Sequence, residues 1–135
     1  METCGIPDLL RRRLIVSIAL KDDTMTNENF QECIDACNAC ALACDQCAAA
    51  CLGEDDVKMM ARCIASDIDC AQICRLAAGF MARGSQFVAQ LCGLCADVCT
   101  ACADECGKHP MDHCQRCAQA CRRCAALCGQ MGAGA

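Results

Sequence analysis

A seven-residue cysteine repeat between residues 33 and 51 constrains this chain more than any other feature. Cysteine stands at positions 33, 37, 40, 44, 47 and 51, in alternating steps of four and three. In a packed heptad helix, these two positions usually carry leucine. The six thiols fall on one stripe of a helix, and this stripe is about 27 Å long. The repeat therefore predicts a helix whose buried face is made of thiols.

The same pattern returns in three further stretches of the chain. It recurs between residues 92 and 106 and between residues 114 and 128, and more thinly between residues 63 and 74. Glycines and capping residues separate the stretches. The pattern predicts four long helices joined by short connections, near residues 26–52, 56–82, 85–106 and 110–128. It favours an all-α fold, an antiparallel up-down-up-down four-helix bundle with a Cys-lined core.

Residues 26–130 are expected to form this bundle, with Pro110 in the first turn of its last helix and Gly129 as the stop. Residues 131–135 are expected to be a frayed tail. Residues 1–25 differ in composition, contain one thiol, Cys4, and are expected to be an arm or a short helix. The run LIVSIAL after three arginines resembles an export signal, but acidic residues follow at once and no cleavage site is present. These signals favour a cytoplasmic location.

Charge and composition exclude two classes of partner. The net charge is −5 and only three residues are aromatic, so neither a basic patch nor a stacking surface for nucleic acid is present. No apolar run reaches the length of about 18 residues that a membrane span needs. We therefore expect neither nucleic acid nor membrane as a partner.

Twenty of the 135 residues are cysteine, which suggests either disulfides or metal binding. Neighbouring thiols on one helix fit disulfides poorly, because Cβ atoms three or four residues apart lie about 5–6 Å from each other. A disulfide brings them to about 3.8 Å. Bridges between helices remain an alternative, but disulfide frameworks usually serve loop-rich folds. The sequence therefore favours reduced thiols that bind a soft metal ion.

The charge of the ion indicates which metal fits such a core. Thiols must lose their protons to bind metal, and uncompensated thiolates cannot stay buried. One Cu(I) per thiolate leaves the core nearly neutral, whereas Zn²⁺ in a four-Cys site leaves a charge of about −2. The sequence therefore predicts that each chain binds many Cu(I) ions, roughly one per core cysteine.

The predicted copper ligands are all cysteines except Cys4, and two histidines at one end of the bundle. The cysteines are Cys33, Cys37, Cys40, Cys44, Cys47, Cys51, Cys63, Cys70, Cys74, Cys92, Cys95, Cys99, Cys102, Cys106, Cys114, Cys117, Cys121, Cys124 and Cys128. The histidines, His113 and His109, are expected to mark the mouth through which copper enters and leaves. We expect at most one of Met59 and Met60 to line the core there.

Other residues carry weaker predictions. The three phenylalanines fall at the opposite end of the bundle, where we expect a hydrophobic plug. Asp67 occupies a stripe position between Cys63 and Cys70, and contacts either a thiol or a neighbouring helix.

Alternative functions remain open from the residues alone. One is a zinc or general thiol-metal buffer, which would bind fewer ions per chain. Another is a thiol redox sensor or oxidoreductase, which needs a cysteine of depressed pKa beside a base or a helix N-terminus. The sequence singles out no such cysteine, so we do not expect an enzyme. Cys33, Cys37 and Cys40 also match an iron–sulfur spacing, but the heptad produces that match automatically.

These features resemble the bacterial copper storage proteins of the cytosolic type. The resemblance covers about residues 26–130, and is carried by CIDACNACALACDQCAAACLGE, CIASDIDCAQIC and HCQRCAQACRRCAALC. It implies a bundle that stores many Cu(I) ions on Cys and assembles as a homotetramer, with a copper chaperone as a candidate partner. It also implies that copper is admitted beside the cysteines of the last helix, which corresponds here to His113 and, less directly, His109.

Overall fold

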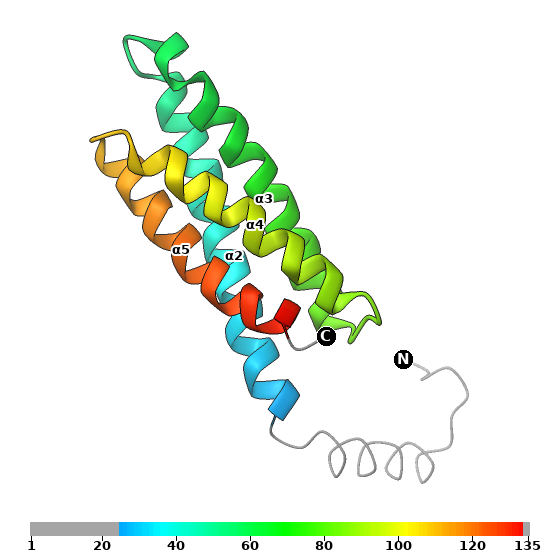
Figure 1. Ribbon diagram of the computed structural model, residues 1–135. Helices are drawn as coiled ribbons and strands as arrows, with labels where there is room; N and C mark the ends of the chain where they lie inside the picture. Colours follow the sequence, from blue (N-terminus) through cyan, green and yellow to red (C-terminus); the bar gives the residue numbers. More distant parts are fainter. Residues whose placement is uncertain (1–24, 134–135) are drawn as a thin grey trace, which may run out of the picture.

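The computed structural model describes residues 25–133, and the predictions for residues 1–24, including Cys4, lie outside this range. The described residues form four α-helices and one short 3₁₀-helix. Their bounds are α2 Met25–Leu52, η1 Val57–Met60, α3 Ala61–Ala82, α4 Val88–Gly107 and α5 Asp112–Ala133. The helices run alternately up and down in one bundle (Figure 1). The predicted all-α four-helix fold is confirmed.

Each helix has two neighbours in the bundle. Helix α2 packs against α3 and α5, and α4 packs against the same two helices. The diagonal helices α3 and α5 meet through core side chains, such as the Sγ atoms of Cys70 and Cys121 at 3.8 Å. The connections α2–α3 and α4–α5 lie at one end, and the connection α3–α4 lies at the other (Figure 1). We call the first end the mouth and the second the closed end. Within residues 25–133, no helix combines the length and apolar content needed to cross a membrane.

Local hydrogen bonds explain where the helices begin. Asp56 caps η1, because its side chain accepts a hydrogen bond from the backbone N–H of Met59 at 3.3 Å. Ser85 instead accepts from the N–H of Phe87 at 3.1 Å, and this turn delays α4 to Val88. Gly84 precedes it with a positive φ of 64°, a conformation that favours glycine.

The expected limits of the last helix are wrong at both ends. Pro110 lies before the helix rather than in its first turn, since α5 begins at Asp112. Gly129 does not stop it, because α5 continues through Gly129 and Gly132 to Ala133. Three of the residues expected in a frayed tail, Met131, Gly132 and Ala133, therefore belong to the helix. The reason is packing: Gly132 lies so close to Gly93 of α4 that a Cβ on Gly132 would lie 2.8 Å from the Cα of Gly93.

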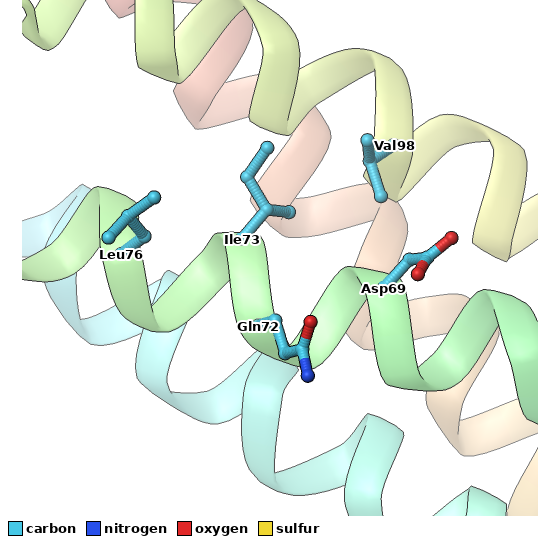
Figure 2. A pocket seen from close by; sticks show the side chains of 5 residues that line it. All are labelled: Asp69, Gln72, Ile73, Leu76 and Val98. Carbon is cyan, nitrogen blue, oxygen red and sulfur yellow. The ribbon is translucent and has the colours of Figure 1, made fainter.

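The outer surface carries an apolar cavity between α3 and α4. Its volume is about 450 Å³. It is lined by Asp69, Gln72, Ile73, Leu76 and Val98 (Figure 2). Leu76 is 51% exposed, which leaves a large apolar side chain in contact with water.

We predict that Gly132→Ala destabilises the bundle. Its Cβ would lie 2.8 Å from the Cα of Gly93, so the helices must separate, at a cost of about 1–3 kcal/mol. The matched control is Gly129→Ala on the same helix, whose Cβ would meet its nearest atom, on Ala96, at 4.0 Å. Removing a helical glycine there should stabilise by up to about 1 kcal/mol. Denaturant unfolding of the reduced apo-protein measures both, and equal effects would contradict the close approach.

Candidate metal centre

The core is lined by cysteine along its whole length. Every cysteine from Cys33 to Cys128 is buried and at most 1% exposed. Helix α2 contributes six, α3 three, α4 five and α5 five, so the stripes predicted from the heptads face one another. Alanines such as Ala41, Ala71 and Ala118 fill the positions beside the stripes, which lets the helices approach closely.

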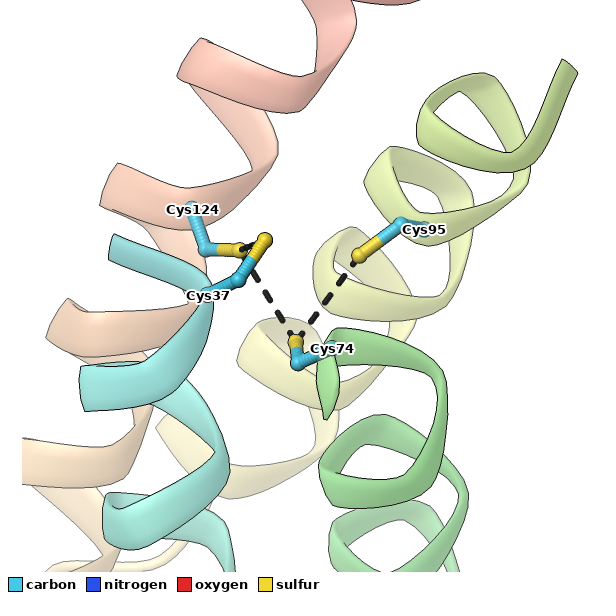
Figure 3. A group of neighbouring side chains, drawn as sticks. All are labelled: Cys37, Cys74, Cys95 and Cys124. Carbon is cyan, nitrogen blue, oxygen red and sulfur yellow. Dashed lines mark hydrogen bonds between the residues drawn. The ribbon is translucent and has the colours of Figure 1, made fainter. Parts of the chain in front are cut away.

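The sulfur atoms form sets of four that span the bundle. Cys37, Cys74, Cys95 and Cys124 come one from each helix, and their side chains point toward one another (Figure 3). The Sγ atoms of such a set all lie within 4.8 Å of one another. Several sets of this kind follow one another along the core, and some share members. Thiolates so arranged can share soft metal ions between helices.

Hydrogen-bonded Sγ–Sγ contacts of 4.0 Å or less link most of the thiols into two groups. The quartet of Cys44, Cys102, Cys117 and Cys121, whose Sγ atoms lie within 4.8 Å of one another, joins the two. We call the first the closed-end group. It consists of Cys33, Cys37, Cys40, Cys44, Cys70, Cys74, Cys95, Cys99, Cys117, Cys121, Cys124 and Cys128. The second is the mouth group. It consists of Cys47, Cys51, Cys63, Cys102, Cys106 and Cys114. Cys92 is buried as well.

Asp67 lies between these two groups and contacts both. Its Oδ1 accepts hydrogen bonds from the thiols of Cys102 at 3.3 Å, Cys106 at 3.2 Å and Cys117 at 3.3 Å. Its side chain is fully buried. Of the two contacts left open for Asp67 by the sequence, the structure therefore shows contact with thiols. The carboxyl group takes a stripe position that a fourth cysteine of α3 would otherwise hold.

Burial keeps these groups in their neutral forms. It raises the pKa of Asp67 to about 9, because a carboxylate loses its hydration in the core. It also raises the pKa of Cys114 to about 11, and raises that of Cys63. Without metal, these three groups are therefore uncharged acids, and a thiol among them releases its proton when metal binds.

Both histidines lie at the mouth, the end of the bundle at which the sequence analysis expects them. His109 is 9% exposed, and its Nε2 lies 3.2 Å from a carboxylate oxygen of Glu105. The Nε2 of His113 is buried and has no hydrogen-bond partner. A buried ring nitrogen without a partner is available to a metal ion.

A small cavity connects His113 to the thiols. It lies between α2 and α5 and has a volume of about 170 Å³. Its lining includes His113, Cys47 and Cys117, together with Gln46 and Arg116. Because Cys47 belongs to the mouth group and Cys117 to the closed-end group, the cavity gives access to both.

The methionines at the mouth lie as predicted, whereas one of the phenylalanines at the closed end does not. Met60 is 1% exposed and Met59 is 64% exposed, so one of the two methionines lines the core, as expected. Phe30 and Phe80 pack against the closed end of the core. Phe87 is 53% exposed, so its expected place in a plug is wrong. The turn at Ser85 directs it outward, and buried Met81 and Val88 take that role.

One residue that organises the mouth gave no signal in the sequence. The side-chain amide of Gln115 donates to the backbone oxygen of His109 at 2.7 Å and to that of Gly107 at 3.3 Å. It therefore fixes the α4–α5 connection and the position of His109. A glutamine among polar helix residues cannot be recognised as such before the connection is seen.

The comparisons with known proteins agree with this geometry. The sequence profile described as "Copper storage protein" matches residues 26–133. A curated relative, the uncharacterized cysteine-rich protein YhjQ of Bacillus subtilis, is 48% identical over 89 residues, which are 65% of this chain and 82% of that protein.

Two solved structures are similar over most of the chain. The Cu(I)-bound copper storage protein BsCsp3 is 46% identical with a TM-score of 0.74, over 77% of this chain and 98% of that one. A cytosolic copper storage protein from Streptomyces lividans with five coppers is 39% identical with a TM-score of 0.77, over 80% and 95% of the two chains.

We predict that the stability of the apo-protein falls as the pH rises, because of Asp67. The folded carboxyl group keeps its proton up to a pH of about 9, whereas the unfolded one loses it above about 4. Unfolding therefore releases a proton between these values, and stability falls by up to about 1.4 kcal/mol per pH unit. Asp67→Asn should remove this slope, and Asp69→Asn, at an exposed position, should keep it. Denaturant titrations at several pH values measure it, and equal slopes in the wild type and Asp67→Asn would exclude this cause.

Proposed function

Because the chain belongs to the copper storage protein family, we propose that it stores Cu(I) ions on the thiolates of its core. One observation carries this proposal: the thiols are buried and in near contact along the whole bundle. Each Cu(I) that replaces a thiol proton leaves the charge of the core unchanged. The core can therefore fill with many ions without burying net charge.

The nineteen cysteines from Cys33 to Cys128 are the ligands in this proposal. His113 and His109 receive copper at the mouth. The partnerless Nε2 of His113 supports this role, and so does the cavity that joins His113 to Cys47 and Cys117. From there, ions pass from thiol to thiol into the closed-end group.

The other functions fit the structure less well. A thiol oxidoreductase needs a sulfur that its substrate can reach, and every described cysteine is at most 1% exposed. A zinc store would bury a charge of about −2 at each four-Cys site. The family supports a storage role rather than catalysis, and we propose that the chain is not an enzyme.

We also propose where the protein acts and with what. The Streptomyces lividans relative is described as cytosolic, which supports a cytoplasmic location for this chain. A copper chaperone is the candidate donor or acceptor of copper. The resemblance to the family suggests a homotetramer, and the apolar cavity between α3 and α4 offers a surface on which copies can pack (Figure 2).

We predict that the reduced apo-protein takes up about one Cu(I) per core cysteine, since one ion balances one thiolate. An anaerobic titration in competition with a strong Cu(I) chelator measures the capacity. Saturation at about four or five ions would instead indicate one ion per four-Cys site and favour the zinc-buffer alternative.

The double variant His109→Ala, His113→Ala should load copper more slowly than the wild type and reach nearly the same capacity. The histidines would capture ions at the mouth, while the cysteines hold them. Stopped-flow mixing with Cu(I) measures the loading rate. Gln46→Ala is the control, because it shortens another side chain of the cavity without removing a metal ligand. An unchanged rate in the histidine variant would refute the role of this end.

Leu76→Glu should shift the protein from tetramer toward smaller species, because it places a charge on the apolar surface between α3 and α4. Light scattering after size-exclusion chromatography measures the mass. Leu42→Glu, at a position on α2 that is 57% exposed, is the control and should leave the assembly intact. A tetramer in both variants would place the interface elsewhere.

A further inference from the structure

The sulfur atoms of Cys47, Cys51, Cys63 and Cys114 at the mouth form a tetrahedron in which the five edges that involve Cys47 or Cys51 are nearly equal. The Sγ of Cys47 lies 3.8 Å from that of Cys51 and 3.9 Å from those of Cys63 and Cys114. The Sγ of Cys51 lies 3.9 Å from that of Cys63 and 3.8 Å from that of Cys114. All four sulfurs lie within 4.8 Å of one another.

The size of this tetrahedron suits a zinc ion. A tetrahedron with these edges has its centre about 2.3–2.4 Å from each corner, and the Zn–S bond is about 2.3 Å. Tetrahedral S₄ coordination is typical of Zn²⁺ in structural sites. An iron–sulfur cluster needs thiolates that are much farther apart. We propose that this quartet is a preformed site for one Zn²⁺ ion, distinct in metal and stoichiometry from the copper store.

The place of the quartet in the fold supports an ion that leaves negative charge behind. Cys63 lies in the first turn of α3 and Cys114 in the first turn of α5. The positive end of a helix dipole stabilises a thiolate there. Cys47 and Cys51 lie near the C-terminus of α2, whose dipole opposes negative charge, so two helix N-termini act against one C-terminus.

A second quartet of similar shape, Cys40, Cys44, Cys70 and Cys121, lacks this support. Its sulfur–sulfur distances range from 3.6 to 4.0 Å. Its members stand in the middle of α2, α3 and α5, away from every helix end. Zn²⁺ there would bury a charge of about −2 without compensation. We therefore expect Zn²⁺ to bind at the mouth quartet, and monovalent ions to bind at the inner quartet.

Binding follows a balanced proton exchange. Four neutral thiols and one Zn²⁺ give a zinc tetrathiolate of charge −2 and release four protons to solvent. If the chain stores copper as proposed, two Cu(I) ions can replace that Zn²⁺ at unchanged charge. Zinc then leaves the mouth as copper enters.

An anaerobic titration of the reduced apo-protein with Zn²⁺ tests the site, with Co²⁺ as a spectroscopic probe in a parallel experiment. We expect one tight ion per chain and the intense visible bands of tetrahedral cobalt bound by thiolates. Cys114→Ser should weaken Zn²⁺ binding at least about tenfold. Cys70→Ser, in the inner quartet, is the matched control and should bind zinc as the wild type does. Far-UV circular dichroism checks that both variants remain helical.

The outcomes separate this proposal from the copper proposal. No tight zinc, several equivalent zinc ions, or loss of zinc in Cys70→Ser but not in Cys114→Ser would each overturn the mouth site. The wild-type stoichiometry decides the question even if Cys114→Ser does not fold. Copper capacity is measured on the same preparations, so a chain that binds many Cu(I) but no zinc retains its storage function and loses this site. Adding Cu(I) to the one-zinc form should release the zinc, and zinc retained at full copper load would overturn the exchange.

Discussion

The structure depends on neutral thiols packed against other neutral thiols. A cysteine with its proton behaves as a small apolar side chain, so a core of cysteine and alanine can hold helices together without metal. The same side chain becomes an anion and a soft ligand once it loses that proton. The core is therefore stable in one protonation state and reactive in the other. Metal binding converts one state into the other without a change of fold or of net charge, provided that the ion is monovalent.

Asp67 is the exception within this core. A carboxyl group in the middle of a bundle costs stability unless it is protonated and hydrogen-bonded, and three thiols donate to its Oδ1. It stands where the contacts between thiols change from the mouth group to the closed-end group. An oxygen ligand, which is poorer for Cu(I) than sulfur, therefore lies beside Cys102 and Cys117, two of the thiols that join the groups. The core of thiols and alanines thus contains one carboxyl group at the place where the two groups of thiols meet.

The heptad was sufficient to predict the helices, their order and the inward face of each cysteine stripe. This is because a period of seven admits only one structure in a chain with so few aromatic or β-branched residues. The end of α5 was not predictable from local signals, since Gly129 reads as a stop until Gly132 is seen to pack against α4. The outward turn of Phe87 depends on one hydrogen bond to Ser85. The side-chain amide of Gln115 and the free ring nitrogen of His113 are properties of the assembled mouth, and no residue pattern encodes them.

The contact between Gly93 and Gly132 has a mechanical consequence. Two helix backbones that touch without intervening side chains can neither approach further nor tilt easily, so α4 and α5 are stiff at the closed end. At the mouth, the cavity between α2 and α5 leaves space into which the side chains that line it can move. The bundle is therefore more rigid at the closed end than at the mouth. Any expansion of the core is therefore directed toward the mouth rather than toward the closed end.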